Sequence, residues 1–179
     1  MRILVTSDTH ARTPDELPAP LVAAFKEADA VIHAGDFTSR AVLEHIEAKT
    51  DLHAVHGNAD STAVRDALPR RKVVNAEGVR ICVVHGHDAF DVAYEAAETG
   101  AHLVVRGHTH TPHYDENAVP VLNPGSPTRP RGSPTSHYAW LVCDDGRFGG
   151  HIISLDGETL VSFGERFDDG TEDSTANSE

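Results

Sequence analysis

The chain has 179 residues, enough for one well-buried domain, and no apolar run approaches the roughly 20 residues that a transmembrane helix needs. It carries 15 basic and 28 acidic residues, a net charge of -13, and such a surface repels nucleic acid, so no DNA- or RNA-binding role is expected. The first residues read as a strand rather than an export signal. Cys82 and Cys143 lie in strand-like runs, which indicates reduced core residues and a cytoplasmic protein.

Lysine is scarce in this acidic chain, with only Lys26, Lys49 and Lys72. At about 1 M salt the screening length falls to roughly 3 Å, so the self-repulsion of a strongly acidic surface becomes tolerable. A halophilic host is therefore one interpretation of the composition. An acidic protein from an ordinary mesophile is the other.

Strand-like and helix-like segments alternate in the first third of the chain. Apolar residues at helical spacing predict helices over residues 20–29 and 41–48, the second of them capped by Ser39. The short apolar runs between these helices predict strands at residues 2–7, 30–34 and 52–55. This order is typical of a parallel sheet covered by helices.

The rest of the chain adds strands that differ in character. A turn at Glu77-Gly78 joins two predicted strands, and Gly100 ends a predicted helix over residues 89–99. Residues 123–135 are predicted to form a proline-rich loop. The remaining predicted strands cover residues 72–75, 79–84, 103–105, 119–122, 137–143, 150–155 and 159–163, and the last of them look antiparallel. Two sheets packed face to face in one α/β domain over residues 1–165 are expected, with a disordered acidic tail at 166–179.

Five clusters of polar side chains follow predicted strands, where the loops of α/β folds converge. Carboxylates and neutral imidazoles together suit divalent ions such as Mn, Fe, Zn, Ni or Co, and a shared carboxylate can bridge two ions about 3.5–4 Å apart. The clusters contain Asp8 and His10, Asp36, Asn58 and Asp60, His85 and His87, and His108 and His110.

Each cluster has an ordinary explanation when it is taken alone. Asp8 could cap a helix, Gly35-Asp36 is a common turn, and Gly57-Asn58 is a frequent turn signal. A single histidine is more often a surface or core residue than a ligand. Five such clusters in order, each after a strand, are hard to explain by chance and indicate a metal site.

The ordered motifs resemble those of the calcineurin-like metallophosphoesterase superfamily. They are Asp8-x-His10, Gly35-Asp36, Gly57-Asn58-x-Asp60, His85-Gly86-His87 and Gly107-His108-Thr109-His110. Together with Asn123-Pro124-Gly125-Ser126 and the small size, they are similar to the compact bacterial and archaeal phosphodiesterase branch over residues 1–165. The resemblance implies a four-layer αββα sandwich of two mixed sheets flanked by helices.

The resemblance also implies a site and a reaction. One divalent ion would be held by Asp8, His10, Asp36 and His110, and the other by Asp36, Asn58, His85 and His108. Manganese is the first choice, with nickel, zinc, iron or cobalt as alternatives. A hydroxide held between the ions would attack a small phosphodiester, and the residues expected to be catalytic are Asp8, His10, Asp36, Asn58 and His85.

One position departs from the family pattern, because Ala59 stands where many members carry a histidine that protonates the leaving group. Substrates with poor leaving groups are therefore expected to react slowly. Asp60 is interpreted as orienting a neighbouring histidine or a backbone turn, or as a plain turn residue. His87 is expected beside the ligands rather than among them, and His33 and His56 remain open between core and site.

Other residues receive structural interpretations. Arg12 is expected to be a solvated surface residue although it follows the first motif, and Ser126 is a weak candidate for a phosphate contact on a mainly structural loop. The histidines interpreted mostly as ordinary surface residues are His45, His53, His102, His113, His137 and His151.

Three alternative functions stay open at this point. A scaffold of the same fold, like the retromer-type subunit in the superfamily, would act in protein assembly with a degraded metal site. A nuclease is disfavoured by the acidic balance, and a phosphomonoesterase would use the same site. Related compact proteins often self-associate, so a homodimer is a further expectation.

Overall fold

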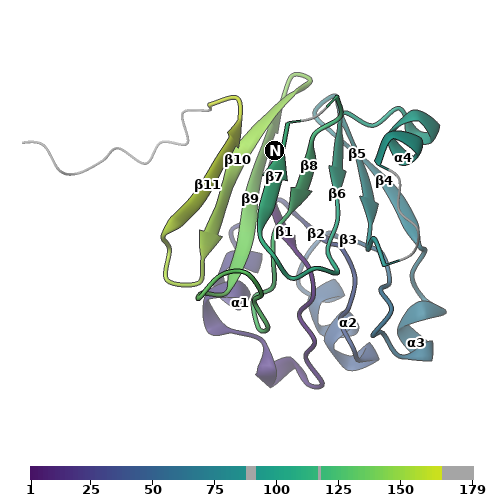
Figure 1. Cartoon of the computed structure of the whole chain (residues 1–179). Helices are drawn as coiled ribbons and strands as arrows, with labels where there is room; N and C mark the ends of the chain where they lie inside the picture. Colours follow the sequence, from purple (N-terminus) through teal and green to yellow (C-terminus); the bar gives the residue numbers. More distant parts are fainter. Residues whose placement is uncertain (88–91, 117, 167–179) are drawn as a thin grey trace, which may run out of the picture.

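The computed structural model describes residues 1–87, 92–116 and 118–166, whose strands form two sheets packed face to face (Figure 1). The strands are β1 (Arg2–Thr6), β2 (Ala30–His33), β3 (Leu52–Ala54), β4 (Arg71–Ala76), β5 (Val79–Val84), β6 (Leu103–Val105), β7 (His113–Asp115), β8 (Val121–Asn123), β9 (His137–Asp144), β10 (Arg147–Ser154) and β11 (Thr159–Gly164). One sheet has the order β11-β10-β9-β1-β2-β3 and the other β4-β5-β6-β8-β7. Both sheets are mixed. In the first, β1, β2 and β3 run parallel and the other pairs are antiparallel. In the second, β5, β6 and β8 run parallel and the pairs of β4 with β5 and of β7 with β8 are antiparallel.

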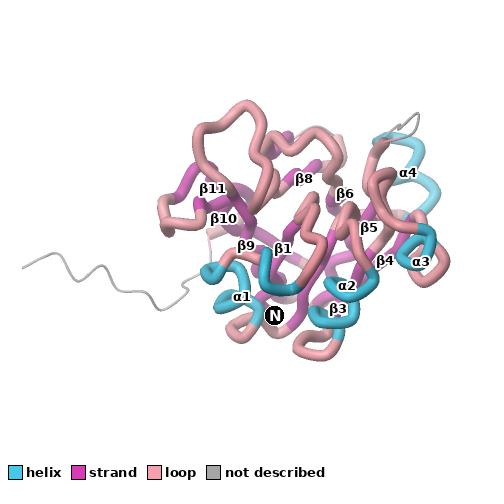
Figure 2. The backbone as a smooth tube through the Cα atoms, turned by 90° about the horizontal axis from the view of Figure 1, so that it is seen from below, coloured by secondary structure: helices cyan, strands magenta, loops and turns pink. Residues whose placement is uncertain are grey.

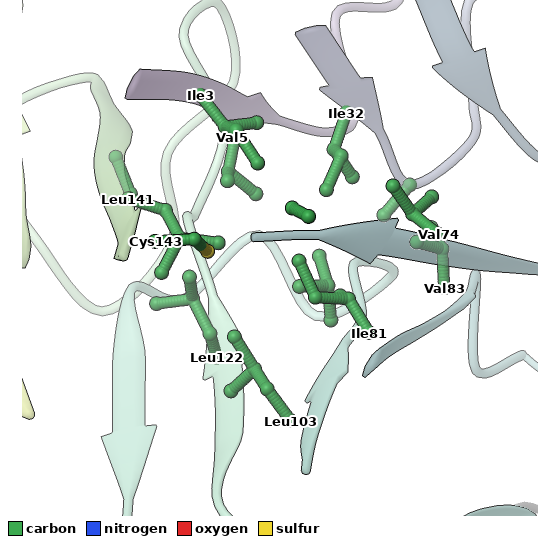
Figure 3. Close-up of a cluster of buried hydrophobic side chains, with 14 of the residues drawn as sticks. Ile3, Val5, Ile32, Val74, Ile81, Val83, Leu103, Leu122, Leu141 and Cys143 are labelled. Carbon is green, nitrogen blue, oxygen red and sulfur yellow. The ribbon is translucent and has the colours of Figure 1, made fainter. Parts of the chain in front are cut away.

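The hydrophobic core between the sheets follows from the two-residue period of the strands. Ile3 and Val5 of β1 point into the space between the sheets, whereas Leu4 points to the outer face. Ile81 and Val83 of β5 come from the opposite side and meet them there (Figure 3).

Helices cover the outer faces of both sheets and complete four layers. They are η1 (Pro14–Glu16), α1 (Ala19–Phe25), α2 (Arg40–Glu47), α3 (Thr62–Arg65) and α4 (Val92–Thr99). The helices α1, α2 and α3 share a buried cluster with Leu4 and Val31 of the six-stranded sheet. Ala96 of α4 packs with Cys82 and Val104 of the other sheet, and Figure 2 shows α1 and α2 on the opposite side of the molecule from α4. The predicted fold class is confirmed.

Several predicted boundaries need correction. The first helix ends at Phe25 rather than at residue 29, because Asp29 already bonds with Arg2, its N–H donating to the Arg2 carbonyl at 2.9 Å. The strand predicted at 150–155 begins at Arg147, since it pairs with the whole of β9. The short elements η1, α3 and β7 were not predicted.

Other predictions concern caps, cysteines and the ends of the described chain. Ser39 caps α2 as predicted, its Oγ accepting the Val42 N–H at 3.3 Å, and Cys82 and Cys143 are buried and free. The predicted start of the helix at residue 89 lies outside the described residues, as does the tail from residue 167. The domain boundary at residue 165 therefore stays a prediction. None of the helices in the described part of the chain is both long and apolar enough to cross a bilayer.

Candidate metal centre

The five predicted clusters meet at one end of the two sheets. The parallel strands β1, β2 and β3 end at the same edge of their sheet, and β5 and β6 do so in theirs. The loops beyond these strands bring seven side chains together: Asp8, His10, Asp36, Asn58, His85, His108 and His110. The structure thus places these residues as the sequence predicted, and their role as ligands stays a prediction.

The first group of donor atoms has the spacing of ligands around a single ion. His10 Nε2 lies 3.1 Å from His110 Nε2 and 3.6 Å from Asp36 Oδ2. His110 Nε2 lies 3.3 Å from Asp8 Oδ1. Ligand atoms about 2.1 Å from one cation lie roughly 3.0–3.4 Å apart in octahedral or tetrahedral geometry. One divalent cation therefore fits among these residues.

A second group lies next to the first and shares Asp36 with it. His85 Nε2 lies 3.3 Å from Asp36 Oδ2 and 3.2 Å from Asn58 Oδ1. His108 Nδ1 lies 3.1 Å from the same Asn58 oxygen. Because Asp36 belongs to both groups, its carboxylate is placed as a bridge between two adjacent cations would be.

Hydrogen bonds to backbone carbonyls set the tautomers of two histidines. His85 Nδ1 donates to the Ala34 carbonyl and His110 Nδ1 to the Arg129 carbonyl, each at 2.7 Å. A carbonyl oxygen only accepts, so the neutral rings carry their protons on Nδ1. Each Nε2 then presents a lone pair to the site, as a ligand to a metal requires.

Asp8 supplies an independent indication of a cation. Its Oδ2 accepts the His108 N–H at 3.0 Å, but its Oδ1 is buried without a hydrogen-bond partner among the described residues. That oxygen faces the lone pair of His110 Nε2, and a buried unpaired acceptor is unfavourable unless a cation satisfies it. Burial also raises the pKa of Asp8. These features fit a divalent ion, which would stabilise the charged carboxylate.

Burial and neighbouring groups tune the other ligands. Burial opposes ionisation of Asp36, but the interaction with the neighbouring His85 and the N–H of Ala59, 2.8 Å from Oδ1, hold the pKa of Asp36 below the usual value. Burial lowers the pKa of His10 to about 4, so this imidazole is neutral at pH 7. Asp36 and His10 therefore offer a charged carboxylate and a neutral imidazole to a cation.

The backbone at the site is strained. Non-glycine residues rarely adopt positive φ, and clusters of such residues are typical of functional sites. Five of the seven candidate ligands have φ between 43° and 69°, namely Asp8, His10, Asp36, His108 and His110.

The buried Asp60 holds the turn that presents Asp36. Its carboxylate accepts N–H groups from Asp36 at 3.0 Å, Thr38 at 2.7 Å and Gly57 at 2.7 Å. Of its predicted roles, the orientation of a backbone turn is the one the structure shows.

The structure supports the structural interpretation of the Ser126 loop over a phosphate contact, and it corrects the interpretation of one histidine. Ser126 is fully buried and donates to the Asp8 carbonyl at 2.7 Å, so it anchors its loop and does not face a substrate. His137 is buried rather than on the surface, and its Nε2 lies 3.0 Å from Thr135 Oγ1.

The histidines left open by the sequence are now placed. His33 is buried, stacks on Phe37 and lies 3.1 Å from Thr9 Oγ1, so it belongs to the core behind the site. The His87 ring lies 5.4 Å from that of His85, beside the ligands as predicted. His56 is half-buried, and Arg12 is exposed.

Comparison with known proteins agrees with this geometry. Residues 1–146 match the calcineurin-like phosphoesterase superfamily domain. The chain belongs to this superfamily. It is 36% identical over 140 residues to a probable metallophosphoesterase of Methanothermobacter thermautotrophicus, which covers 73% of this chain and 80% of the relative. It is 29% identical to a phosphodiesterase of Methanocaldococcus jannaschii over 139 residues, 70% of this chain and 83% of that protein.

A solved structure extends the likeness in fold. The zinc complex of Vps29 from Entamoeba histolytica superposes with a TM-score of 0.74, and the match covers 93% of this chain and 98% of the other. The sequences are 21% identical, so this likeness concerns the fold alone. The resemblance noted from the motifs is confirmed at the level of the superfamily.

Proposed function

We propose that this superfamily member is a metal-dependent phosphodiesterase with two divalent ions. The observation that carries the proposal is the pair of donor groups that share Asp36, one of them with the unpaired Asp8 Oδ1. The name of the Methanocaldococcus jannaschii relative supports a diester as the substrate.

The residues of the chain have distinct parts in this reaction. The first ion would be held by Asp8, His10, Asp36 and His110, and the second by Asp36, Asn58, His85 and His108. Once bound, such ions supply a Lewis acid that makes hydroxide available near pH 7 and offsets charge on the phosphate oxygens. The carbonyl-bound His85 and His110 keep their rings in one orientation, so the donor atoms need little rearrangement.

The donor chemistry limits the choice of ions. Mixed carboxylate, amide and imidazole donors suit manganese, which is our first choice, and also iron, cobalt, nickel or zinc. The leaving group follows from Ala59, whose methyl side chain cannot donate a proton. Diesters with good leaving groups are therefore the substrates that we expect to react fastest.

The test is hydrolysis of bis-p-nitrophenyl phosphate by the metal-free protein after addition of each metal. Manganese should give activity, and Asp8→Asn and His85→Asn should each lower kcat/KM at least about 100-fold while the circular dichroism spectrum is retained. His151→Gln, an exposed histidine of β10, is the matched control and should keep wild-type activity. Wild-type turnover in either site variant would refute the site assignment.

A scaffold without catalytic activity is the second candidate, because the same fold occurs in Vps29, which is named as a vacuolar protein sorting protein. All seven candidate positions carry metal-competent side chains here, which favours the enzyme. Complete inactivity with every metal, despite measured metal binding, would favour the scaffold.

A further inference from the structure

A loop beside the first donor group is tied to the strand ends that carry Asp8 and His10. Ser126 Oγ donates to the Asp8 carbonyl at 2.7 Å. Thr128 Oγ1 donates to the Thr9 carbonyl at 2.8 Å. The following residues are therefore held close to the donor atoms.

Two arginines in this loop are bonded through their backbones to one candidate ligand. The Arg129 carbonyl accepts from His110 Nδ1 at 2.7 Å, and the Arg131 N–H donates to the His110 carbonyl at 3.1 Å. Both side chains are exposed.

Neither guanidinium has an ion pair or hydrogen bond within the described part of the chain. Three other exposed arginines have carboxylate partners: Arg40 lies 2.9 Å from Glu44, Arg71 2.8 Å from Glu95 and Arg147 3.3 Å from Glu165. Without such a partner, the guanidinium groups of Arg129 and Arg131 are available to bind an anion.

Charge balance indicates what these arginines would bind, and this step rests on the proposed function. Two divalent ions, two aspartates, a hydroxide and a singly charged phosphodiester would together be neutral. Arg129 and Arg131 would then remain as excess positive charge beside bound cations, an arrangement that a further anion would stabilise.

We propose that Arg129 and Arg131 bind a second phosphate of the substrate, so that the substrate class is a phosphodiester that also bears a terminal phosphomonoester. Guanidinium groups match phosphate oxygens in bidentate geometry. A terminal phosphate carries about -1.5 to -2 charges at pH 7, enough to offset both arginines. Arg12, the other arginine near the first motif, is less suited because Glu16 accepts its backbone N–H at 2.7 Å and places a carboxylate beside it.

The first experiment compares two substrates that differ by one phosphate. These are thymidine 5′-(p-nitrophenyl phosphate) and the same compound with a 3′-phosphate, assayed with manganese. The wild-type protein should favour the 3′-phosphorylated compound about tenfold or more in kcat/KM, and Arg129→Gln and Arg131→Gln should each reduce that ratio. Arg147→Gln, a paired arginine at the opposite end of the first sheet, should keep it.

The second experiment measures binding without metal or turnover. Titration calorimetry of the metal-free protein at low ionic strength should show thymidine 3′,5′-bisphosphate binding about tenfold or more tightly than thymidine 5′-monophosphate. Arg129→Gln should remove most of this difference, and Arg129→Lys should retain part of it.

The outcomes separate this inference from the proposed function. Equal affinities of the wild-type protein for the two nucleotides would overturn the second phosphate site, and so would a ratio that the arginine variants leave unchanged. A nucleotide preference that persists in a protein without phosphodiesterase activity would support the anion site and refute the enzyme. Activity on bis-p-nitrophenyl phosphate without any preference between the nucleotides would support the enzyme and refute the anion site.

Discussion

Asp60 supports the candidate ligand Asp36 without facing the metal site itself. Its carboxylate accepts three backbone N–H groups of the turn that carries Asp36. In Asp60→Asn one oxygen becomes an NH₂ group that faces those donors. We expect a loss of about 1–3 kcal/mol in the free energy of unfolding and a manganese affinity roughly 10–100-fold lower. Urea unfolding and metal titration measure the two effects.

Asp29→Asn is the matched control, because Asp29 also accepts a backbone N–H, from Arg2 at 2.7 Å, but is exposed and distant from the site. It should leave manganese affinity unchanged. An Asp60→Asn variant with wild-type affinity would show that Asp36 does not depend on this turn.

His33 makes stability depend on pH. Burial lowers its pKa to about 3, whereas an unfolded histidine has a pKa of about 6.5. Below pH 6.5 the unfolded chain binds a proton that the native chain does not, so stability falls as the pH drops from about 6.5 towards 3. This group alone should account for about 2 kcal/mol of lost stability between pH 7 and pH 5.

Urea unfolding of the metal-free protein at pH 7 and pH 5 tests this expectation. His33→Gln should show a smaller decrease than the wild type, even if it is less stable at both values. The exposed His151→Gln should show the wild-type decrease. Equal decreases in all three proteins would contradict a neutral buried His33.

The identities of the candidate ligands were readable from the sequence, but their supporting contacts were not. Asp8 and His85 follow strands in recognisable motifs, so their convergence could be predicted. The carbonyls of Ala34 and Arg129 set the tautomers of His85 and His110, and every residue type has such a carbonyl. Nothing in the residue type of Arg129 distinguishes it from other loop arginines.

Among the elements, α2 has a clear capping signal. The Ser39 hydroxyl accepts the Val42 N–H at the start of the helix. Ser39→Ala should therefore lower the free energy of unfolding by about 1 kcal/mol. Ser61 precedes α3 without a side-chain cap bond, so Ser61→Ala in urea unfolding is the control and should cost less. Equal losses would contradict the capping interpretation.

Elements with a strong pattern were predictable, and short ones were not. The continuous apolar run of β1 and the cap of α2 gave their positions to within one residue. The three-residue β7 has only half-buried or exposed side chains, so no alternation marks it; pairing with β8 creates the strand. The first helix ended early because of a contact with Arg2 from another part of the sequence.

At the scale of the whole molecule, the net charge of -13 fits either a salt-adapted protein or an ordinary acidic one. If the surface is salt-adapted, raising KCl from about 0.1 M to about 2 M should raise the Tm of the metal-free protein, because screening weakens repulsion between its carboxylates. Thermal unfolding followed by circular dichroism measures this change. A flat or falling Tm would favour the mesophilic interpretation.

The candidate ligands are divided between the sheets: Asp8, Asp36 and Asn58 follow strands of the six-stranded sheet, and His85 and His108 follow strands of the other. A cation shared by these donors would cross-link the two sheets at the end where the ligands lie. Removal of the metal by a chelator would then abolish activity and would also let the two sheets separate at the end that carries the ligands, while the hydrophobic core stayed packed. Amide protons near Asp8 and His108 would be the first to exchange with solvent.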